Sequence, residues 1–211
     1  QRLLWNTEAQ HRAPSLPVVW RRLVIRAYLQ LQADDDARRA LVRYELDYES
    51  EEQNIDWVLL QAQVLLRTGR PQQAIQLLNK IPLENAVDVE ALLLIARLQH
   101  EPDKAASISQ QMREKLDGKL LSRSARWAYS YVAYLAAKVL GDQAAQISNL
   151  ESMLSLGIEY PVFDDSYQVT ADDLWGIYNE QGLRLANDSG LLFGNDQQWQ
   201  KLSDKLLKKE P

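Results

Sequence analysis

Apolar residues recur at helical intervals along most of the chain. Between Trp20 and Leu31 they stand at positions 20, 23, 24, 27, 28 and 31, which is the spacing of an amphipathic α-helix. Pro17 suits the start of that helix, because the first turn of a helix needs no partner for the backbone N–H. No segment shows the convincing period-two alternation expected of a half-buried strand. The pattern therefore predicts an all-α protein.

Acidic residues, serines, prolines and glycines divide the chain into further helices. Asp34–Asp36 would begin one of them, and Ser122 or Ser124 would begin another. Gly69 and Gly141 would end helices, because glycine readily adopts the left-handed conformation found there. The expected helices begin near residues 20, 34, 55, 71, 88, 102 and 122, and a further one ends at Gly157. The connections are short, which favours antiparallel packing of neighbours.

The helices come in pairs, and a small residue recurs early in the second helix of each pair. Ala40, Ala74, Ala106 and Ala145 take this place, at spacings of 34, 32 and 39 residues. A small side chain allows two helices to approach closely, and a period in this range is typical of a helical solenoid. We therefore expect helix pairs stacked on one another.

The clearest repeat is Trp57–Ile81, and it resembles the tetratricopeptide repeat. That family has small residues at repeat positions 8 and 20, a glycine near 15, and large apolar residues at 11, 24 and 27. These positions are filled here by Ala62, Ala74, Gly69, Leu65, Leu78 and Ile81. The same frame places Ala96 and Ala133 at position 8 of later repeats, whereas the family's glycine at 8 and tyrosine at 11 are absent. The resemblance implies a right-handed α-solenoid of antiparallel helix pairs.

The regular pattern stops after residue 157. We expect residues 1–157 to form the tetratricopeptide-like array, as a fragment of a longer chain, since Gln1–Trp5 has the character of the middle of a helix. Residues 158–211 are expected to add a loop and a C-terminal helix pair that continues or caps the array. Thr170–Asp173 has the pattern of a helix-capping motif at the start of this pair.

Composition excludes several classes of function. The chain has 211 residues, of which 24 are basic and 29 acidic, with a net charge of −5 and a pI of 5.2. This balance argues against nucleic acid as a partner, because phosphate binding requires a basic face. The chain has no cysteine, which excludes disulfides, cysteine-ligated metal centres and a thiol nucleophile. The longest nearly uncharged stretch, Trp127–Leu140, contains Lys138 and is too short to span a membrane.

The sequence predicts no catalytic residue, no metal site and no cofactor. His11 and His100 are far apart and have no serine or carboxylate pattern around them. The acidic pairs Asp164–Asp165 and Asp172–Asp173 lack calcium-loop spacing, and helix capping explains the second pair. Asn187–Ser189 matches a glycosylation acceptor but equally suits a turn. We therefore expect a protein that is not an enzyme.

The resemblance also implies a binding surface on the array. In tetratricopeptide proteins the first helix of each pair lines the concave face, through repeat positions 2, 5, 9 and 12. The residues at such positions here include Arg21, Tyr28, Asp56, Gln63, Glu90, Arg97, Trp127 and Tyr134. This mixture of rings, amides and both charges suits a peptide segment of a protein partner, or a glycan.

Two questions about this surface stay open at the level of the sequence. Trp127, Tyr131 and Tyr134 share one helix face, so they either pack between repeats as core residues or line the groove. The acidic and aromatic loop 159–166 is a second possible docking segment.

The predicted function is a non-catalytic scaffold that binds a partner segment along the concave surface. The alternative is an accessory helical module of a larger enzyme, similar to the helical arms of lytic transglycosylases, with catalysis outside these residues. A nucleic-acid-reading repeat array is disfavoured by the net charge. The glutamine-rich, acidic, cysteine-free helices resemble those of bacterial envelope proteins, including scaffolds of polysaccharide export. A periplasmic location is therefore expected, with a cytoplasmic one as the alternative.

Overall fold

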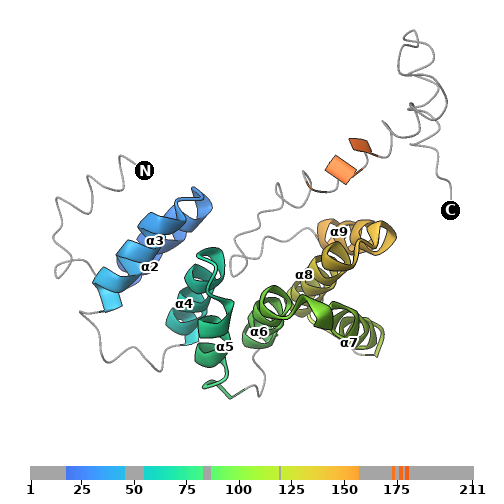
Figure 1. Cartoon of the computed structure of the whole chain (residues 1–211), viewed down its shortest axis with the longest axis horizontal. Coiled ribbons are helices and arrows are strands. Elements are labelled where there is room, and N and C mark those ends of the chain that lie inside the picture. Colours follow the sequence, from blue (N-terminus) through green and yellow to red (C-terminus); the bar gives the residue numbers. More distant parts are fainter. Residues whose placement is uncertain are drawn as a thin grey trace, which may run out of the picture.

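The computed structural model describes residues 18–45, 55–82, 87–118 and 120–156, together with 173, 176–177 and 179–180. All secondary structure within these residues is helical, which confirms the predicted class. Figure 1 shows four successive helix pairs: α2 (Val18–Gln30) with α3 (Asp34–Glu45), α4 (Ile55–Arg67) with α5 (Pro71–Leu78), α6 (Val87–His100) with α7 (Ala105–Gly118), and α8 (Arg123–Leu140) with α9 (Gln143–Ser155). A short 3-10 helix, η3 (Pro102–Lys104), joins α6 to α7.

The helices begin and end at residues that satisfy the free backbone groups of a helix terminus. The Ser122 hydroxyl accepts a hydrogen bond of 3.1 Å from the backbone N–H three residues later, at the start of α8. Asp142 caps α9 in the same way, at 3.0 Å. Gly69 and Gly141 both have a φ of +70°, the left-handed conformation that ends α4 and α8. Of the two serines that could begin this helix, Ser122 is therefore the capping residue and Ser124 is not.

Buried alanines mark the predicted contacts between helices. The four alanines of the predicted repeat frame are all buried, as expected for a close helix contact: Ala62, Ala74, Ala96 and Ala133. Because a protein interior is densely packed, a small side chain at such a place sets the distance between two helices. The repeat frame taken from the sequence is therefore confirmed at these positions.

The alanine spacing in the second helices is wrong at one position. Ala106 is exposed, and its neighbour Ala105 is the residue that is fully buried. Ala105 stands three residues after Pro102, just as the buried Ala74 stands three residues after Pro71, so the first of the two adjacent alanines takes the buried position. Ala40 is buried as expected, and Ala145 is half-buried.

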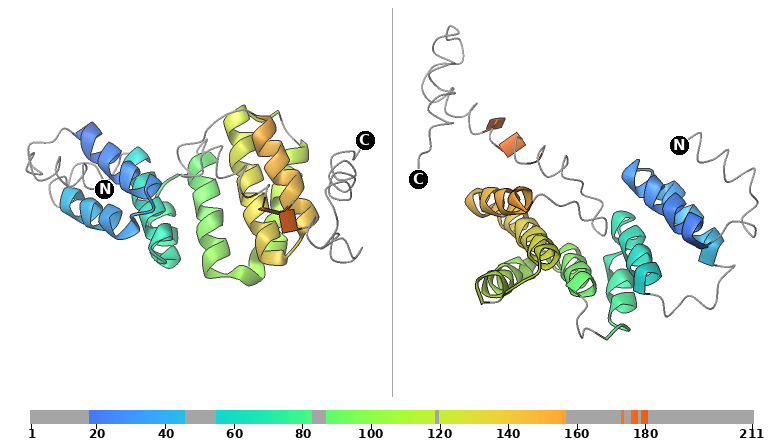
Figure 2. Two further views of the ribbon diagram at one scale, coloured as in Figure 1. Left: turned by 90° about the horizontal axis from the view of Figure 1, so that it is seen from above. Right: turned by 180° about the vertical axis from the view of Figure 1, so that it is seen from behind.

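The pairs stack through their first helices. Contacts run from α2 to α4, from α4 to α6 and from α6 to α8, and each first helix also packs against neighbouring second helices. The α4 helix contributes to two apolar clusters, because Trp57, Leu60 and Val64 face α2 and α3 while Leu59 and Leu66 join the cluster that extends to α9. The views of Figure 2 show the same order of pairs along the molecule. The result is a tetratricopeptide-like solenoid.

Several predicted features lie outside the described residues. They are Gln1–Trp5, His11, the loop 159–166 with Asp164 and Asp165, Asp172, the turn Asn187–Ser189 and most of the predicted C-terminal helix pair. No helix in the described part of the chain combines the length and the apolar character needed to cross a membrane.

Candidate functional site

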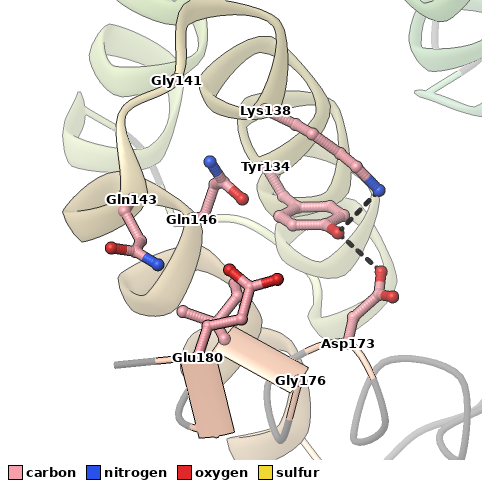
Figure 3. Close-up of a pocket in the computed structure, with 9 residues that line it drawn as sticks. Tyr134, Lys138, Gly141, Gln143, Gln146, Asp173, Gly176 and Glu180 are labelled. Carbon is pink, nitrogen blue, oxygen red and sulfur yellow. Dashed lines mark hydrogen bonds between the residues drawn. The ribbon is translucent and has the colours of Figure 1, made fainter. Parts of the chain in front are cut away.

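A polar pocket of about 430 Å³ lies where α8, α9 and the segment around residue 176 meet (Figure 3). Its lining combines one aromatic ring, two side-chain amides and charged groups of both signs. The lining residues are Tyr134, Lys138, Gly141, Gln143, Gln146, Asp173, Gly176, Ile177 and Glu180. The pocket is therefore shared between the last described helix pair and a segment that follows it in the sequence.

Three side chains form a hydrogen-bonded chain at one edge of the pocket. The Tyr134 hydroxyl donates to Asp173 Oδ2 at 2.6 Å and accepts from Lys138 Nζ at 3.5 Å, as the dashed lines in Figure 3 show. The Lys138 ammonium also lies 5.7 Å from the centroid of the Tyr134 ring. Tyr134 and Lys138 are four residues apart on α8, which places them on one helix face. A hydrogen bond from a hydroxyl to a carboxylate is typically this short, because the negative charge strengthens it.

The charges of the pocket suit polar recognition. Among the described residues that line it, Lys138 is the one cation, and Asp173 and Glu180 are the two carboxylates. Gln143 and Gln146 come from the first turn of α9 and offer amide groups that both donate and accept. No group of three or more potential metal ligands occurs within the described ranges. The arrangement can thus hold a polar group by charge and hydrogen bonds.

The structure buries five of the eight predicted lining residues. They are Arg21, Tyr28, Gln63, Trp127 and Tyr134. The Arg21 guanidinium lies 5.6 Å from the centroid of the Tyr44 ring, so it faces α3, the second helix of its own pair. Trp127 belongs to the large apolar cluster and stacks on Tyr131, with 5.4 Å between ring centroids. Of the two alternatives left open by the sequence, core or groove, the structure places Trp127 in the core.

The remaining three predicted residues are more accessible. Arg97 is exposed near the end of α6, and Asp56 is exposed at the start of α4, 3.8 Å from Arg22. Arg97 and Tyr134 directly follow the frame alanines of their helices, so they stand at equivalent places one repeat apart. Arg97 is therefore an exposed residue on α6 at the repeat position that Tyr134 takes on α8.

Glu90 serves the packing of three helices. Its carboxylate accepts hydrogen bonds from the Tyr129 hydroxyl at 2.8 Å and from Lys115 Nζ at 3.0 Å. The Lys115 ammonium lies 5.0 Å from the centroid of the Tyr129 ring. Burial of Tyr129, followed by its hydrogen bond to Glu90 and the charge of that group, raises the pKa of the phenol above its ordinary value. This cluster links α6, α7 and α8.

Sequence reasoning did not identify Lys138, Gln143, Gln146 and Asp173 as members of a site. Lys138 stands one helical turn after Tyr134, and that spacing is a signal that could have drawn attention to it. The contact between Tyr134 and Asp173 spans 39 residues and depends on the path of the chain after α9. No local pattern in the sequence indicates such a contact.

Comparison with protein families supports the repeat assignment. A family model described as tetratricopeptide repeat matches residues 46–98, which cover α4, α5 and most of α6. Comparison with curated proteins gives no match, and comparison with solved structures gives none either. The match includes Trp57–Ile81, where the sequence frame was clearest, and the stacked pairs extend the same architecture on both sides. The chain is a tetratricopeptide-like helical repeat protein.

Proposed function

We propose that this protein is a non-catalytic scaffold that binds a segment of a partner protein along the first-helix side of its array. The tetratricopeptide repeat is typical of protein–protein interaction modules, and stacked repeats present an extended surface to a partner. The observation that carries the proposal is the polar pocket beside Tyr134 and Lys138, with exposed Arg97 one repeat away. Together these groups provide hydrogen bonds and two positive charges along neighbouring first helices.

A protein segment suits these groups better than the other partner classes. The chain carries a net charge of −5, and the pocket itself has two carboxylates for one lysine, which disfavours a nucleic-acid backbone. A glycan would need an exposed ring face for stacking, whereas Tyr134 is only 3% exposed. The proposed partner is therefore a polypeptide.

The setting of this scaffold is also a proposal. We infer a role in bacterial envelope assembly or polysaccharide export, in the periplasm, from the acidic, cysteine-free and glutamine-rich helices. Fractionation of the producing cell checks the compartment. Recovery with the cytoplasmic proteins would contradict the periplasmic location and leave the scaffold function unchanged.

Site-specific photo-crosslinking in cells that produce the full chain tests the scaffold function. A photoreactive amino acid replaces Arg97 in one variant and Arg113 in the other, since both are exposed arginines but Arg113 lies on the second helix α7. We expect a crosslinked protein from position 97 that is absent from position 113, with mass spectrometry mapping the crosslink to one segment of the partner. Equal products from both positions, or none from position 97, would contradict the proposal.

A further inference from the structure

The hydroxyl of Tyr134 is occupied by a group from the same chain. Asp173 lies beyond the last described pair, yet its Oδ2 accepts the Tyr134 hydrogen bond at 2.6 Å. Gly176, Ile177 and Glu180 line the same pocket, so these residues lie near the end of α8 and the start of α9. Figure 3 shows Asp173 pointing toward the Tyr134 hydroxyl and the Lys138 ammonium. The structure thus already contains a carboxylate seated at the edge of the pocket.

The two α8 side chains are suited to a carboxylate. Lys138 donates to the Tyr134 oxygen at 3.5 Å, which polarises the hydroxyl and strengthens the hydrogen bond that it donates. The positive charge of Lys138 stabilises an anion placed beside that hydroxyl. Gln143 and Gln146 stand across the pocket. The Gln146 Nε2 donates to the Ala137 carbonyl at 3.5 Å, so the Gln143 amide and the Gln146 carbonyl oxygen can meet the backbone of a bound segment.

We propose that Tyr134 and Lys138 form a receptor for an acidic side chain of the partner segment, and that Asp173 occupies this receptor in cis. The inference rests on the proposed scaffold function and names the chemistry of its ligand. Because Asp173 is tethered to the array, the partner must displace it. Only the fraction of molecules with an open cis contact can bind the partner, so the apparent affinity is the intrinsic affinity multiplied by that fraction. Arg97, one repeat away, adds positive charge along the path of an acidic segment.

Peptide binding to the full-length chain tests the receptor. The probe is a fluorescent peptide with the sequence of residues 168–182, and the matched control peptide carries Asp173→Asn. The proteins are the wild type, Asp173→Ala, and Asp173→Ala combined with Tyr134→Phe or with Lys138→Gln. Asp103→Ala, at an exposed acidic residue of η3, controls for the loss of one negative charge elsewhere.

Asp173→Ala is expected to bind the acidic peptide about tenfold more tightly than the wild type, because the tethered competitor is gone. Tyr134→Phe or Lys138→Gln in that background should reverse the gain, and the Asn peptide should bind about fivefold more weakly than the Asp peptide. Circular dichroism confirms that each variant keeps its helices. Lys138 is exposed, so its substitution tests the receptor even if a change at Tyr134 disturbs folding.

Two outcomes would overturn the receptor. One is equal affinity of the wild type and Asp173→Ala for the acidic peptide, and the other is equal affinity of Asp173→Ala for the two peptides. If crosslinking from position 97 persists in either case, the scaffold function stands and only the carboxylate receptor fails. If that crosslink is absent, the scaffold function fails independently of the peptide result.

Discussion

Replacing Glu90 with leucine is expected to destabilise the middle of the array by about 2–3 kcal/mol. The Tyr129 hydroxyl donates to Glu90 at 2.8 Å in a part-buried site, and Tyr129 as a residue is 5% exposed, so leucine at position 90 would leave the hydroxyl without its acceptor where few water molecules have access. A buried hydrogen bond to a charged group typically contributes about 1.5–3 kcal/mol. The Lys115–Glu90 ion pair adds little, since the two side chains are 31% and 25% exposed and solvent screens the pair to about 1 kcal/mol or less.

Urea unfolding followed by circular dichroism and tryptophan fluorescence measures this loss. Tyr129→Phe alone should cost about 1.5 kcal/mol, the lower end of this range, because it removes one part-buried hydrogen bond, retains the ring and leaves Glu90 paired with Lys115. The double variant Glu90→Leu/Tyr129→Phe should be more stable than the sum of the single effects predicts, by about 1 kcal/mol, since no buried group is then left without a partner. Glu114→Leu on the exposed side of α7 is the control, with an expected change within about 0.5 kcal/mol.

The double-mutant cycle decides whether the three-helix cluster acts as a unit. Strict additivity of Glu90→Leu and Tyr129→Phe would show that the two side chains do not stabilise each other. A loss below about 0.5 kcal/mol for Glu90→Leu would refute the reasoning about the buried hydroxyl.

Three further predictions follow from single residues. Ala74→Leu should cost about 1–3 kcal/mol of stability by overpacking α5 against its neighbours. Ala106→Leu, at an exposed alanine, is the control and should change the unfolding midpoint little. Equal effects of the two substitutions would contradict the repeat frame. Gly141→Ala should cost about 1 kcal/mol because φ is +70° there, and an unchanged melting temperature would count against this. The raised pKa of Tyr129 means that the folded chain holds this proton more tightly than the unfolded chain, so stability should fall as the pH rises above about 10. Tyr129→Phe should show a shallower fall in urea titrations at pH 9–11, and identical slopes would exclude this contribution.

The sequence predicts the repeat frame well because the frame depends on local rules. Ala62, Ala74, Ala96 and Ala133 are buried as the spacing requires, and Gly141 ends α8 as its conformational freedom allows. The frame fails at Ala106, because two alanines adjoin there and the buried one is Ala105, three residues after Pro102 as Ala74 is three residues after Pro71. A repeat length that varies by a few residues cannot decide which of two adjacent alanines is buried.

The candidate site could be predicted only in part. A first helix inside a stack is apolar on more than one face, as α4 shows, so periodicity alone cannot tell a groove-lining ring from a core ring. Trp127 illustrates this ambiguity, since its spacing suits both places and the structure packs it in the core. The contact between Tyr134 and Asp173 joins distant parts of the chain, and no local pattern encodes it.

The burial of Trp127 and Tyr134 changes which side chains can supply binding energy to a partner. Rigid aromatic side chains usually provide much of the binding energy of an interface, but Trp127 and Tyr134 are buried in this arrangement. The accessible groups along the first helices include Arg97 and Lys138, which act mainly through charge. Charge-based recognition gives fast association and moderate affinity, and at physiological ionic strength salt largely screens exposed charges that are more than about 8 Å apart. An acidic partner segment should therefore bind this array reversibly. Its apparent affinity should be set by competition with Asp173 for the receptor beside Lys138.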